Sequence, residues 1–278
     1  MDLATVTQYA PAQPTAWREG DAYLGGGTWL LSVPQPRVTR LLDLMSCDWP
    51  PLTETDDGLD VAATCTLAEL ARWRPAPHRH WAAATDLPRK CCDALLGSFK
   101  VQNVATVGGN ICLSLPAGPM IALAAALDGI ATILDPAGAA RAVPVARFVT
   151  GDRRNVLRPG ELLRSVFLPS RALRRTAACR QVSLSPVGRS AVLLVGTLDP
   201  EGEVLLTLTA AVPRPVRVRL PLTSRPNEAA RCLSQAVSAA DDRGYLDDVH
   251  GSASWRRAMT EHAAVAVVAE LTGSGPAG

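Results

Sequence analysis

Residues 101–110 have the sequence VQNVATVGGN, with two adjacent glycines near the end. Gly108 and Gly109 lack a β-carbon, so the backbone is free to adopt positive φ and an anion can approach the amides closely. The Thr106 hydroxyl and the Asn110 amide add two hydrogen-bond donors suited to phosphate oxygens. The stretch therefore predicts a loop that binds an anionic group.

A second glycine-rich stretch, Gly25-Gly26-Gly27-Thr28, directly follows a short strand expected at 22–24. Neither stretch is specific alone, because a triple glycine is more often a flexible turn than a phosphate site. The chain has no GxGxxG and no GxxxxGK[ST], so it shows neither a Rossmann fingerprint nor a P-loop. Two such loops facing each other suit pyrophosphate, and the residues alone lead to an anionic cofactor.

The surrounding pattern predicts short strands and helices up to Pro169. Thr66 is expected to cap a helix over 67–73, with Glu69 completing a capping box. Further helices are expected at 82–96 and at 120–127, and strands at 40–44, 59–63, 131–134, 142–145 and 161–168. Beyond Pro169 the strands lengthen (178–184, 190–198 and 204–211) and are followed by helices at 227–239, with Asn227 as N-cap, and 254–271. The sequence therefore predicts an α+β protein with two domains, residues 1–169 and 170–278.

Composition excludes several classes of protein. Of 278 residues, 47% are hydrophobic and 4% aromatic, so the core must consist of Ala, Val and Leu. A formal net charge of +2 indicates neither nucleic acid nor an anionic membrane as a partner. No signal-peptide pattern is visible, and the longest apolar stretch, 120–127, is too short to span a bilayer. We expect a cytoplasmic protein.

No catalytic constellation or metal site is evident. The seven cysteines include no CxxC, and we expect them to be reduced and mostly buried. His78 and His80 are interpreted as solvated loop residues, and His250 as a residue that caps or packs against a helix. No Ser–His–Asp or Cys–His set emerges, which suits a protein whose chemistry is carried by a cofactor.

Four segments in this order resemble the FAD-binding subunit of molybdenum hydroxylases. They are GGGTWLL (25–31), VAATCTLAEL (61–70), LGSFKVQNVATVGGNIC (96–112) and PGELLRSVFLP (159–169). The family includes the medium subunit of carbon monoxide dehydrogenase and the flavin subunit or domain of xanthine and aldehyde oxidoreductases. The resemblance continues through LTLTAAVPRPVR (206–217) and the region 250–257, so it covers nearly the whole chain.

The resemblance implies a fold of the vanillyl-alcohol oxidase (PCMH) type. Two α/β subdomains clamp FAD, and a small antiparallel sheet with helices follows. In the family both glycine-rich segments contact the FAD pyrophosphate, and further positions line the flavin or its tail. Carried over to this chain, the cofactor-binding residues are Gly25, Gly26, Gly27, Thr28, Trp29, Leu96, Thr106, Gly108, Gly109, Asn110, Leu163 and Arg180.

Two positions depart from the family pattern. Several members have a lysine at the position of Arg180. The arginine keeps the positive charge but presents it with a different geometry. Many members carry an acidic residue after the second glycine segment, whereas Leu115–Met120 here has none. The FAD ribose therefore lacks an expected carboxylate partner.

The implied function is electron transfer within an oxidoreductase heterotrimer. The large subunit would carry molybdopterin, a small subunit would carry [2Fe-2S] clusters, and FAD on this chain would pass electrons to NAD⁺, oxygen or another acceptor. One alternative is a stand-alone flavin reductase of the same fold, such as the enzyme that makes UDP-N-acetylmuramate, although its catalytic serine and glutamate are not evident here. The other alternative is a structural subunit that has lost FAD.

Overall fold

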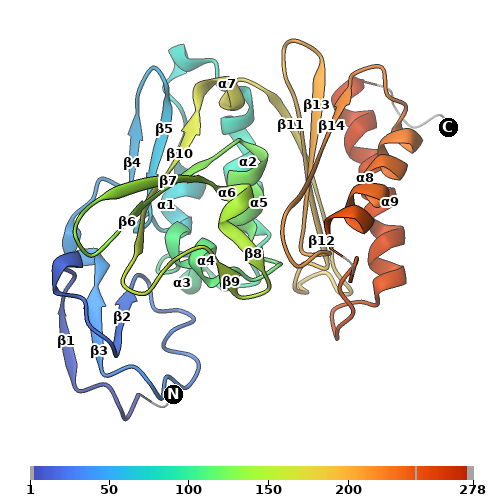
Figure 1. Ribbon diagram of the computed structural model, residues 1–278. Coiled ribbons are helices and arrows are strands. Elements are labelled where there is room, and N and C mark those ends of the chain that lie inside the picture. The colour runs from blue at the N-terminus through green and yellow to red at the C-terminus, as the bar shows by residue number, and fades with distance from the viewer. Residues whose placement is uncertain (1–2, 242, 274–278) are drawn as a thin grey trace.

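The protein begins with a small parallel sheet. The computed structural model describes residues 3–241 and 243–273 (Figure 1). Strands β1 (Gln8–Pro11) and β2 (Asp21–Leu24) both pair in parallel with β3 (Arg40–Asp43), which lies between them. Short 3-10 turns, η1 (Pro14–Ala16) and η2 (Leu44–Cys47), follow β1 and β3. Because β2 ends at Leu24, the triple glycine leaves the edge of this sheet.

A five-stranded antiparallel sheet forms the centre of the N-terminal part. Its order is β4-β5-β10-β6-β7, so β10 occupies the middle. The strands are β4 (Leu52–Glu54), β5 (Gly58–Ala62), β6 (Ile130–Leu134), β7 (Ala140–Pro144) and β10 (Leu162–Pro169). Four apolar residues of β10, Leu162, Leu163, Val166 and Leu168, are buried, as expected for a strand with neighbours on both sides.

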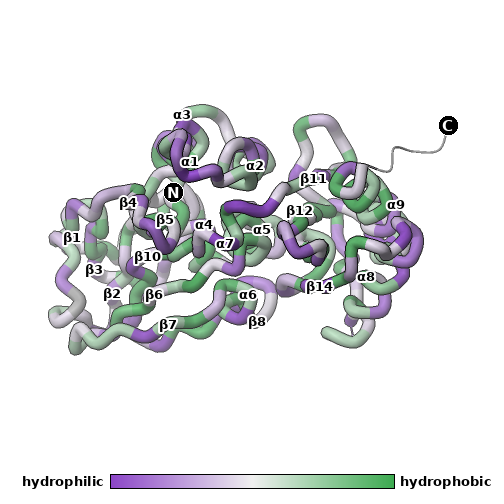
Figure 2. Tube along the Cα trace, turned by 90° about the horizontal axis from the view of Figure 1, so that it is seen from above, coloured by the Kyte–Doolittle hydropathy of each residue, from purple (hydrophilic) through white to green (hydrophobic). Residues whose placement is uncertain are grey.

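Short helices cover this sheet. They are α1 (Leu67–Arg72), α2 (Ala82–Asp93), α3 (Phe99–Gln102), α4 (Val107–Leu113), α5 (Pro119–Ala126), α6 (Val145–Phe148) and α7 (Ser170–Leu173). The 3-10 turn η3 (Pro77–Arg79) precedes α2, and the hairpin β8 (Val149–Gly151) and β9 (Arg154–Asn155) follows α6. All eight residues of α5 are buried, because its sequence PMIALAAA is apolar all round. Helix α5 lies between the two large sheets (Figure 2).

The C-terminal part is a four-stranded antiparallel meander with two helices. Its strands run in sequence order, β11 (Thr176–Val182), β12 (Val192–Leu198), β13 (Glu203–Thr209) and β14 (Val216–Pro221). Helices α8 (Pro226–Ala240) and α9 (Ala253–Thr272) pack on one face, and α5 covers the other (Figure 1). Strand β12 is almost wholly buried because both of its faces are covered.

Alternate residues of β12 belong to two hydrophobic cores. Leu193 and Val195 face the N-terminal core, whereas Val192 and Leu194 face the C-terminal core. This follows from the two-residue period of a strand. The division into domains at Pro169 stays a prediction, since β12 contributes to both cores.

The α+β class is confirmed. Of three local features expected from the sequence, one is confirmed and two were wrong. Thr66 and Glu69 form the expected capping box at the start of α1. The expectation that Asn227 caps α8 was wrong, because Pro226 takes the first helical position and Arg225 is the N-cap. The expectation that Gly108 and Gly109 lie in a loop was also wrong, because both belong to α4.

Candidate functional site

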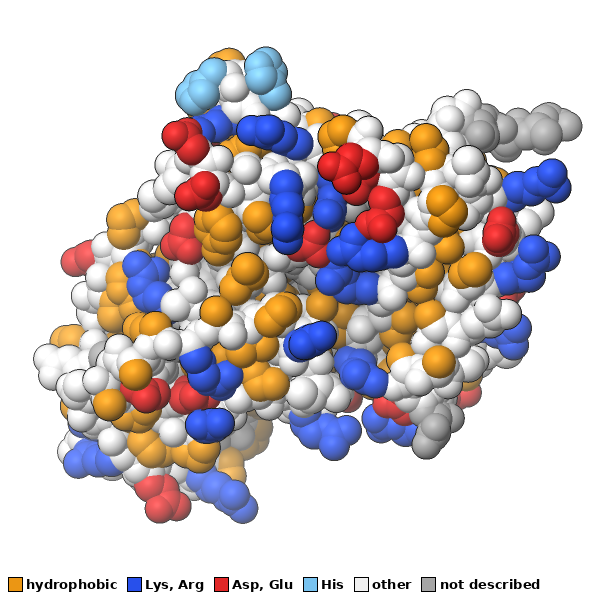
Figure 3. All heavy atoms as spheres, turned by 45° about the horizontal axis from the view of Figure 1, so that its top comes forward, with side chains coloured by type: hydrophobic (Ala, Val, Ile, Leu, Met, Phe, Trp, Pro, Cys, Tyr) orange, Lys and Arg blue, Asp and Glu red, His pale blue; other side chains and the backbone are white. Residues whose placement is uncertain are grey.

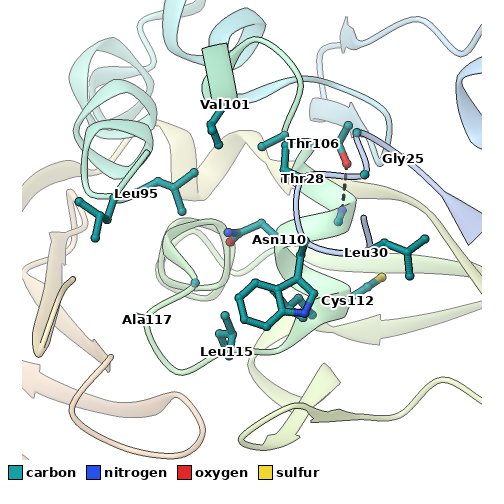
Figure 4. Close-up of a pocket in the computed structure, with 18 of the residues that line it drawn as sticks. Gly25, Thr28, Leu30, Leu95, Val101, Thr106, Asn110, Cys112, Leu115 and Ala117 are labelled. Atoms are coloured by element: carbon teal, nitrogen blue, oxygen red, sulfur yellow. Dashed lines mark hydrogen bonds between the residues drawn. The ribbon is translucent and has the colours of Figure 1, made fainter. Parts of the chain in front are cut away.

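A pocket of about 570 Å³ lies where the triple glycine, α4, the end of α2 and the β11–β12 loop come together (Figure 4). Its volume falls within the range of about 300–1,000 Å³ typical of small-molecule and cofactor sites. The walls come from four parts of the chain. They are Tyr23, Gly25, Gly26, Gly27, Thr28, Trp29 and Leu30; Ala94, Leu95, Leu96, Val101, Ala105 and Thr106; Gly109, Asn110, Cys112, Leu113, Leu115, Ala117 and Gly118; and Arg189 and Ser190.

The first glycine segment lies directly against the second. A β-carbon on Gly26 would come 1.7 Å from the Val104 carbonyl oxygen, and one on Gly25 would come 2.9 Å from Thr106 Oγ1. Gly27 adopts φ +68°, where glycine is favoured. The close approach of the two segments therefore depends on the missing side chains.

The backbone amides of residues 26–30 are available as donors. Within the described part of the chain none of these five amides donates a hydrogen bond, and the first amide of the segment to do so is that of Leu31, to Gly27 O at 2.9 Å. These residues are half-buried or exposed, so water reaches their amides when the pocket is open. A run of backbone donors on a pocket wall also fits a ligand with several acceptor oxygens.

In the second glycine segment, in contrast, backbone amides are already hydrogen-bonded within the protein. Thr106 caps α4, and its Oγ1 accepts from the Gly109 amide at 3.1 Å (dashed in Figure 4). The Val107 and Gly108 amides donate to the carbonyl oxygens of Cys65 and Ala63. A β-carbon on Gly108 would come 2.4 Å from the Ala63 side chain, so this glycine permits close packing and does not line the pocket.

Asn110 presents a polar group in the middle of the pocket. Its Oδ1 accepts from the Met120 amide at 3.0 Å and so caps the start of α5. This bond leaves Nδ2 without a partner among the described residues. Figure 4 shows the amide group directed from α4 toward the side of the pocket that holds Leu95. Asn110 is therefore a fixed donor facing the cavity.

The remaining walls are mostly apolar. No Asp or Glu is among the described residues that line the pocket, and Arg189 supplies its charged side chain. Burial raises the pKa of the Cys112 thiol to about 12, so this wall residue stays neutral. The Trp29 ring, 37% exposed, has the Arg153 guanidinium carbon 5.4 Å from its centroid. The pocket suits a largely apolar ligand with an anionic centre.

The structure brings together nine of the twelve residues expected to bind a cofactor. Gly25, Gly26, Gly27, Thr28, Trp29, Leu96, Thr106, Gly109 and Asn110 line the pocket, and their role as cofactor contacts stays a prediction. Three lie elsewhere. Gly108 packs on Ala63, Leu163 is 2% exposed in the core on β10, and Arg180 pairs with Glu270 of α9 at 2.5 Å.

Several wall residues gave no sequence signal. Ala94, Leu95 and Ser190 belong to ordinary helix and strand ends that meet only in the folded chain. Ser190 Oγ donates to Ala94 O at 3.3 Å and joins these two ends. Arg189 was not expected on the wall either, because nothing in the sequence distinguishes it from the other arginines.

Other chemistry-bearing residues do not form sites. Within residues 3–241 and 243–273, no three His, Cys, Asp or Glu side chains gather as metal ligands. All seven cysteines are free thiols, and His78 and His80 are exposed. No helix in these ranges combines the length and apolar character needed to cross a membrane.

Residues 6–171 match the family model of the FAD binding domain in molybdopterin dehydrogenase. Xanthine dehydrogenase from Oryza sativa subsp. japonica is 31% identical over 121 residues, which are 41% of this chain and 8% of that protein. Xanthine dehydrogenase 2 of Arabidopsis thaliana is 31% identical over 125 residues, 42% of this chain and 9% of that protein. The chain thus corresponds to a small part of these relatives.

Solved structures show the same fold over the whole chain. A chain of quinoline 2-oxidoreductase from Pseudomonas putida 86 superposes with a TM-score of 0.80 and 20% identity, covering 99% of each chain. A chain of carbon monoxide dehydrogenase from Oligotropha carboxidovorans superposes with a TM-score of 0.81 and 18% identity, covering 98% of this chain and 99% of that one.

Proposed function

Because the chain belongs to the family of FAD-binding domains of molybdopterin dehydrogenases, we propose that it is the FAD-carrying electron-transfer subunit of a molybdenum hydroxylase complex. In this proposal a partner with [2Fe-2S] clusters delivers electrons, a large partner holds molybdopterin, and NAD⁺ or another acceptor takes the electrons. Redox chemistry is supplied by FAD when bound. The chain binds the cofactor, orients it and keeps water from its ring.

The unused amides of residues 26–30 carry this proposal. They lie on the wall of a pocket that Asn110 also lines. Pyrophosphate offers several acceptor oxygens in a short span, which matches a run of backbone donors. The glycines allow these amides to come close to Val104 and Thr106 without steric conflict. These residues therefore fit the central, anionic part of FAD.

The apolar walls fit the flat ends of the same molecule. Leu95, Leu96 and Val101 form one side, and Leu113, Leu115 and Ala117 form another. Such side chains exclude water and pack against aromatic rings. The described lining contains no carboxylate for the ribose hydroxyls, so we propose that backbone carbonyl oxygens bind them.

The pocket also bears on domain organisation. We propose that residues 1–169 form the FAD-binding domain and that residues 170–278 form a second domain which closes the pocket. Arg189 and Ser190 of the second part line the cavity. A cofactor bound between the two parts would stabilise their contact by binding the folded state preferentially.

The experiment is the visible absorption spectrum of the purified full chain, with chromatography of the cofactor released on denaturation. We expect a flavin spectrum and about one FAD per chain, or uptake of one added FAD by cofactor-free protein. Gly26→Ala is expected to abolish binding, because its β-carbon would come 1.7 Å from the Val104 carbonyl oxygen. The control Gly138→Ala meets no atom within 4 Å, and its φ of +84° makes alanine cost about 1–2 kcal/mol of stability. We expect it to lose no FAD.

The competing function is a structural subunit without FAD. The acid-free lining is the observation that favours it. Wild-type protein that folds yet takes up no added FAD would establish this alternative and contradict the proposal. Equal FAD binding by Gly26→Ala and Gly138→Ala would show that FAD binds elsewhere.

A further inference from the structure

Arg189 is a charged residue without a partner. It is partly buried on the pocket wall, and within the described residues it forms no ion pair and no hydrogen bond. Arg180, on the preceding strand β11, differs because it pairs with Glu270. A half-buried arginine on the wall of a cavity, with no partner among the described residues, fits a ligand group with negative charge.

The backbone around Arg189 is held in place. The adjacent Ser190 side chain is 3% exposed, donates to Ala94 O at 3.3 Å and accepts from Gln181 Nε2 at 2.9 Å. On the other side, the Gly188 amide donates to Ser185 O at 2.9 Å. These bonds attach the β11–β12 loop to the end of α2, so the Arg189 side chain starts from a defined position.

This end of the pocket is distinct from the wall that offers the free amides. Its apolar wall is formed by Ala94, Leu95 and Leu96. Neighbouring segments carry exposed apolar side chains. They are Leu96 (60% exposed) after α2, Phe99 (71%) on α3, and Leu184 (61%) and Val187 (79%) in the β11–β12 loop. Figure 3 shows apolar and basic side chains bordering the middle of this face. A ring that exchanges electrons with another protein must lie near the surface, which assigns the flavin ring to this end.

We propose that Arg189 lies beside the flavin ring and raises its reduction potential. This inference rests on the proposed function. Uptake of two electrons and one proton leaves the ring with one additional negative charge. A guanidinium stays protonated at any pH the protein tolerates, and a fixed positive charge next to the ring stabilises the reduced form more than the oxidised form. Arg189 thus acts directly on the redox equilibrium of the cofactor through its charge.

The test is the midpoint potential of FAD on the full chain, measured for wild type, Arg189→Gln and Arg189→Lys. Arg189→Gln should lower the affinity for reduced FAD about tenfold relative to oxidised FAD, which is a fall of about 30 mV for a two-electron couple. Arg189→Lys keeps the charge and should restore most of the difference. Arg171→Gln removes the same charge from an exposed site on α7 and should leave the potential unchanged.

Two results would overturn the inference. An unchanged potential in Arg189→Gln, with affinity for both redox states reduced equally, would place the guanidinium at the pyrophosphate. An equal fall of the midpoint potential in Arg189→Gln and Arg189→Lys would show that the shape of the side chain, and not its charge, sets the potential. Circular dichroism identifies a variant that fails to fold. If Arg189→Gln fails, Arg189→Met, which also removes the charge, takes its place in the comparison. Failure of wild-type protein to bind FAD would contradict the proposed function itself.

Discussion

Arg256 donates to the carbonyl oxygen of Ala191 at 2.6 Å from a side chain that is 1% exposed. The same guanidinium donates to Ala210 O at 2.9 Å, to Gly251 O at 3.1 Å and to Asp248 at 2.5 Å. Helix α9 is thereby attached to the start of β12 and the end of β13. Because Ala191 follows Ser190, this buried cation also holds the base of the loop that carries Arg189.

Arg256→Gln should therefore lower the free energy of unfolding by about 3 kcal/mol, because buried carbonyl oxygens and one carboxylate lose their donor. Urea unfolding of the full chain measures this. The control is the next residue, Arg257→Gln, whose pair with Glu261 is exposed on both sides. We expect Arg257→Gln to lose less than about 0.5 kcal/mol of unfolding free energy. Equal losses in the two variants would contradict the stabilising role of the buried Arg256 guanidinium.

Asn110→Asp separates the two functions of this side chain. The carboxylate still accepts from the Met120 amide, so the unfolding free energy should change by less than about 1 kcal/mol. The donor that faces the pocket is lost, and a negative charge opposes the phosphates. We expect the dissociation constant for FAD to rise at least about tenfold in a fluorescence titration. Asn110→Ala should lose stability as well, and unchanged FAD affinity in Asn110→Asp would exclude this contact.

Asp128 connects the two halves of the molecule through arginines. It pairs with Arg175 at 2.8 Å, with Arg219 at 3.8 Å and with Arg217. Burial raises the pKa of the Asp128 carboxyl, but Arg217 and Arg175 outweigh burial and hold the pKa below its usual 3.8.

Asp128→Asn should cost about 3 kcal/mol of unfolding free energy, because it leaves the 6% exposed Arg175 without its carboxylate. Asp128 adopts φ +52°, a conformation that asparagine tolerates, so the variant tests charge without backbone strain. The exposed pair of Arg89 and Asp93 provides the control. Asp93→Asn should cost less than about 0.5 kcal/mol in the same urea titration. A comparable loss in both variants would show that the ion pairs of Asp128 stabilise the protein no more than an exposed pair does.

The ion pair between Glu161 and Arg141 should make the free energy of unfolding fall in acid. The hydrogen bonds from Arg141 lower the pKa of its carboxyl from 4.5 to about 2. A lowered folded-state pKa stabilises the protein above the unfolded value, and this contribution disappears as pH falls from about 4.5 toward 2. The difference in unfolding free energy between wild type and Glu161→Gln should be greatest at pH 7 and should shrink between pH 4.5 and pH 3. A difference independent of pH would contradict the ion pair.

The sequence predicted the fold class and those elements whose signals are local. The Thr66–Glu69 capping box spans four residues, and the apolar run of α5 needs no distant partner to be recognised. The helix at Gly108 could not be predicted this way, because the acceptors for the Val107 and Gly108 amides are carbonyl oxygens of Cys65 and Ala63, more than forty residues earlier. Glycine-rich composition favoured a loop, and tertiary hydrogen bonds favoured a helix.

The candidate site shows the same limit. Nine of its residues were expected from the resemblance and from the glycine pattern, which are properties of short segments. Arg189 and Ser190 were not, because their place on the wall depends on the bond between Ser190 and Ala94, 96 positions apart. Leu163 and Arg180 were expected there but lie in the core and beside α9, respectively.

The central place of β10 has a consequence for biosynthesis. Gly58 pairs with Pro169 across β5 and β10, so the middle strand of the sheet is also its last to be made. At typical translation rates of about 5–20 residues per second, β5 waits on the ribosome for roughly 5 to 20 seconds with one edge unpaired. Exposed strand edges attract other chains. The nascent protein therefore passes through an interval in which its own sheet leaves that edge open to contacts with other chains.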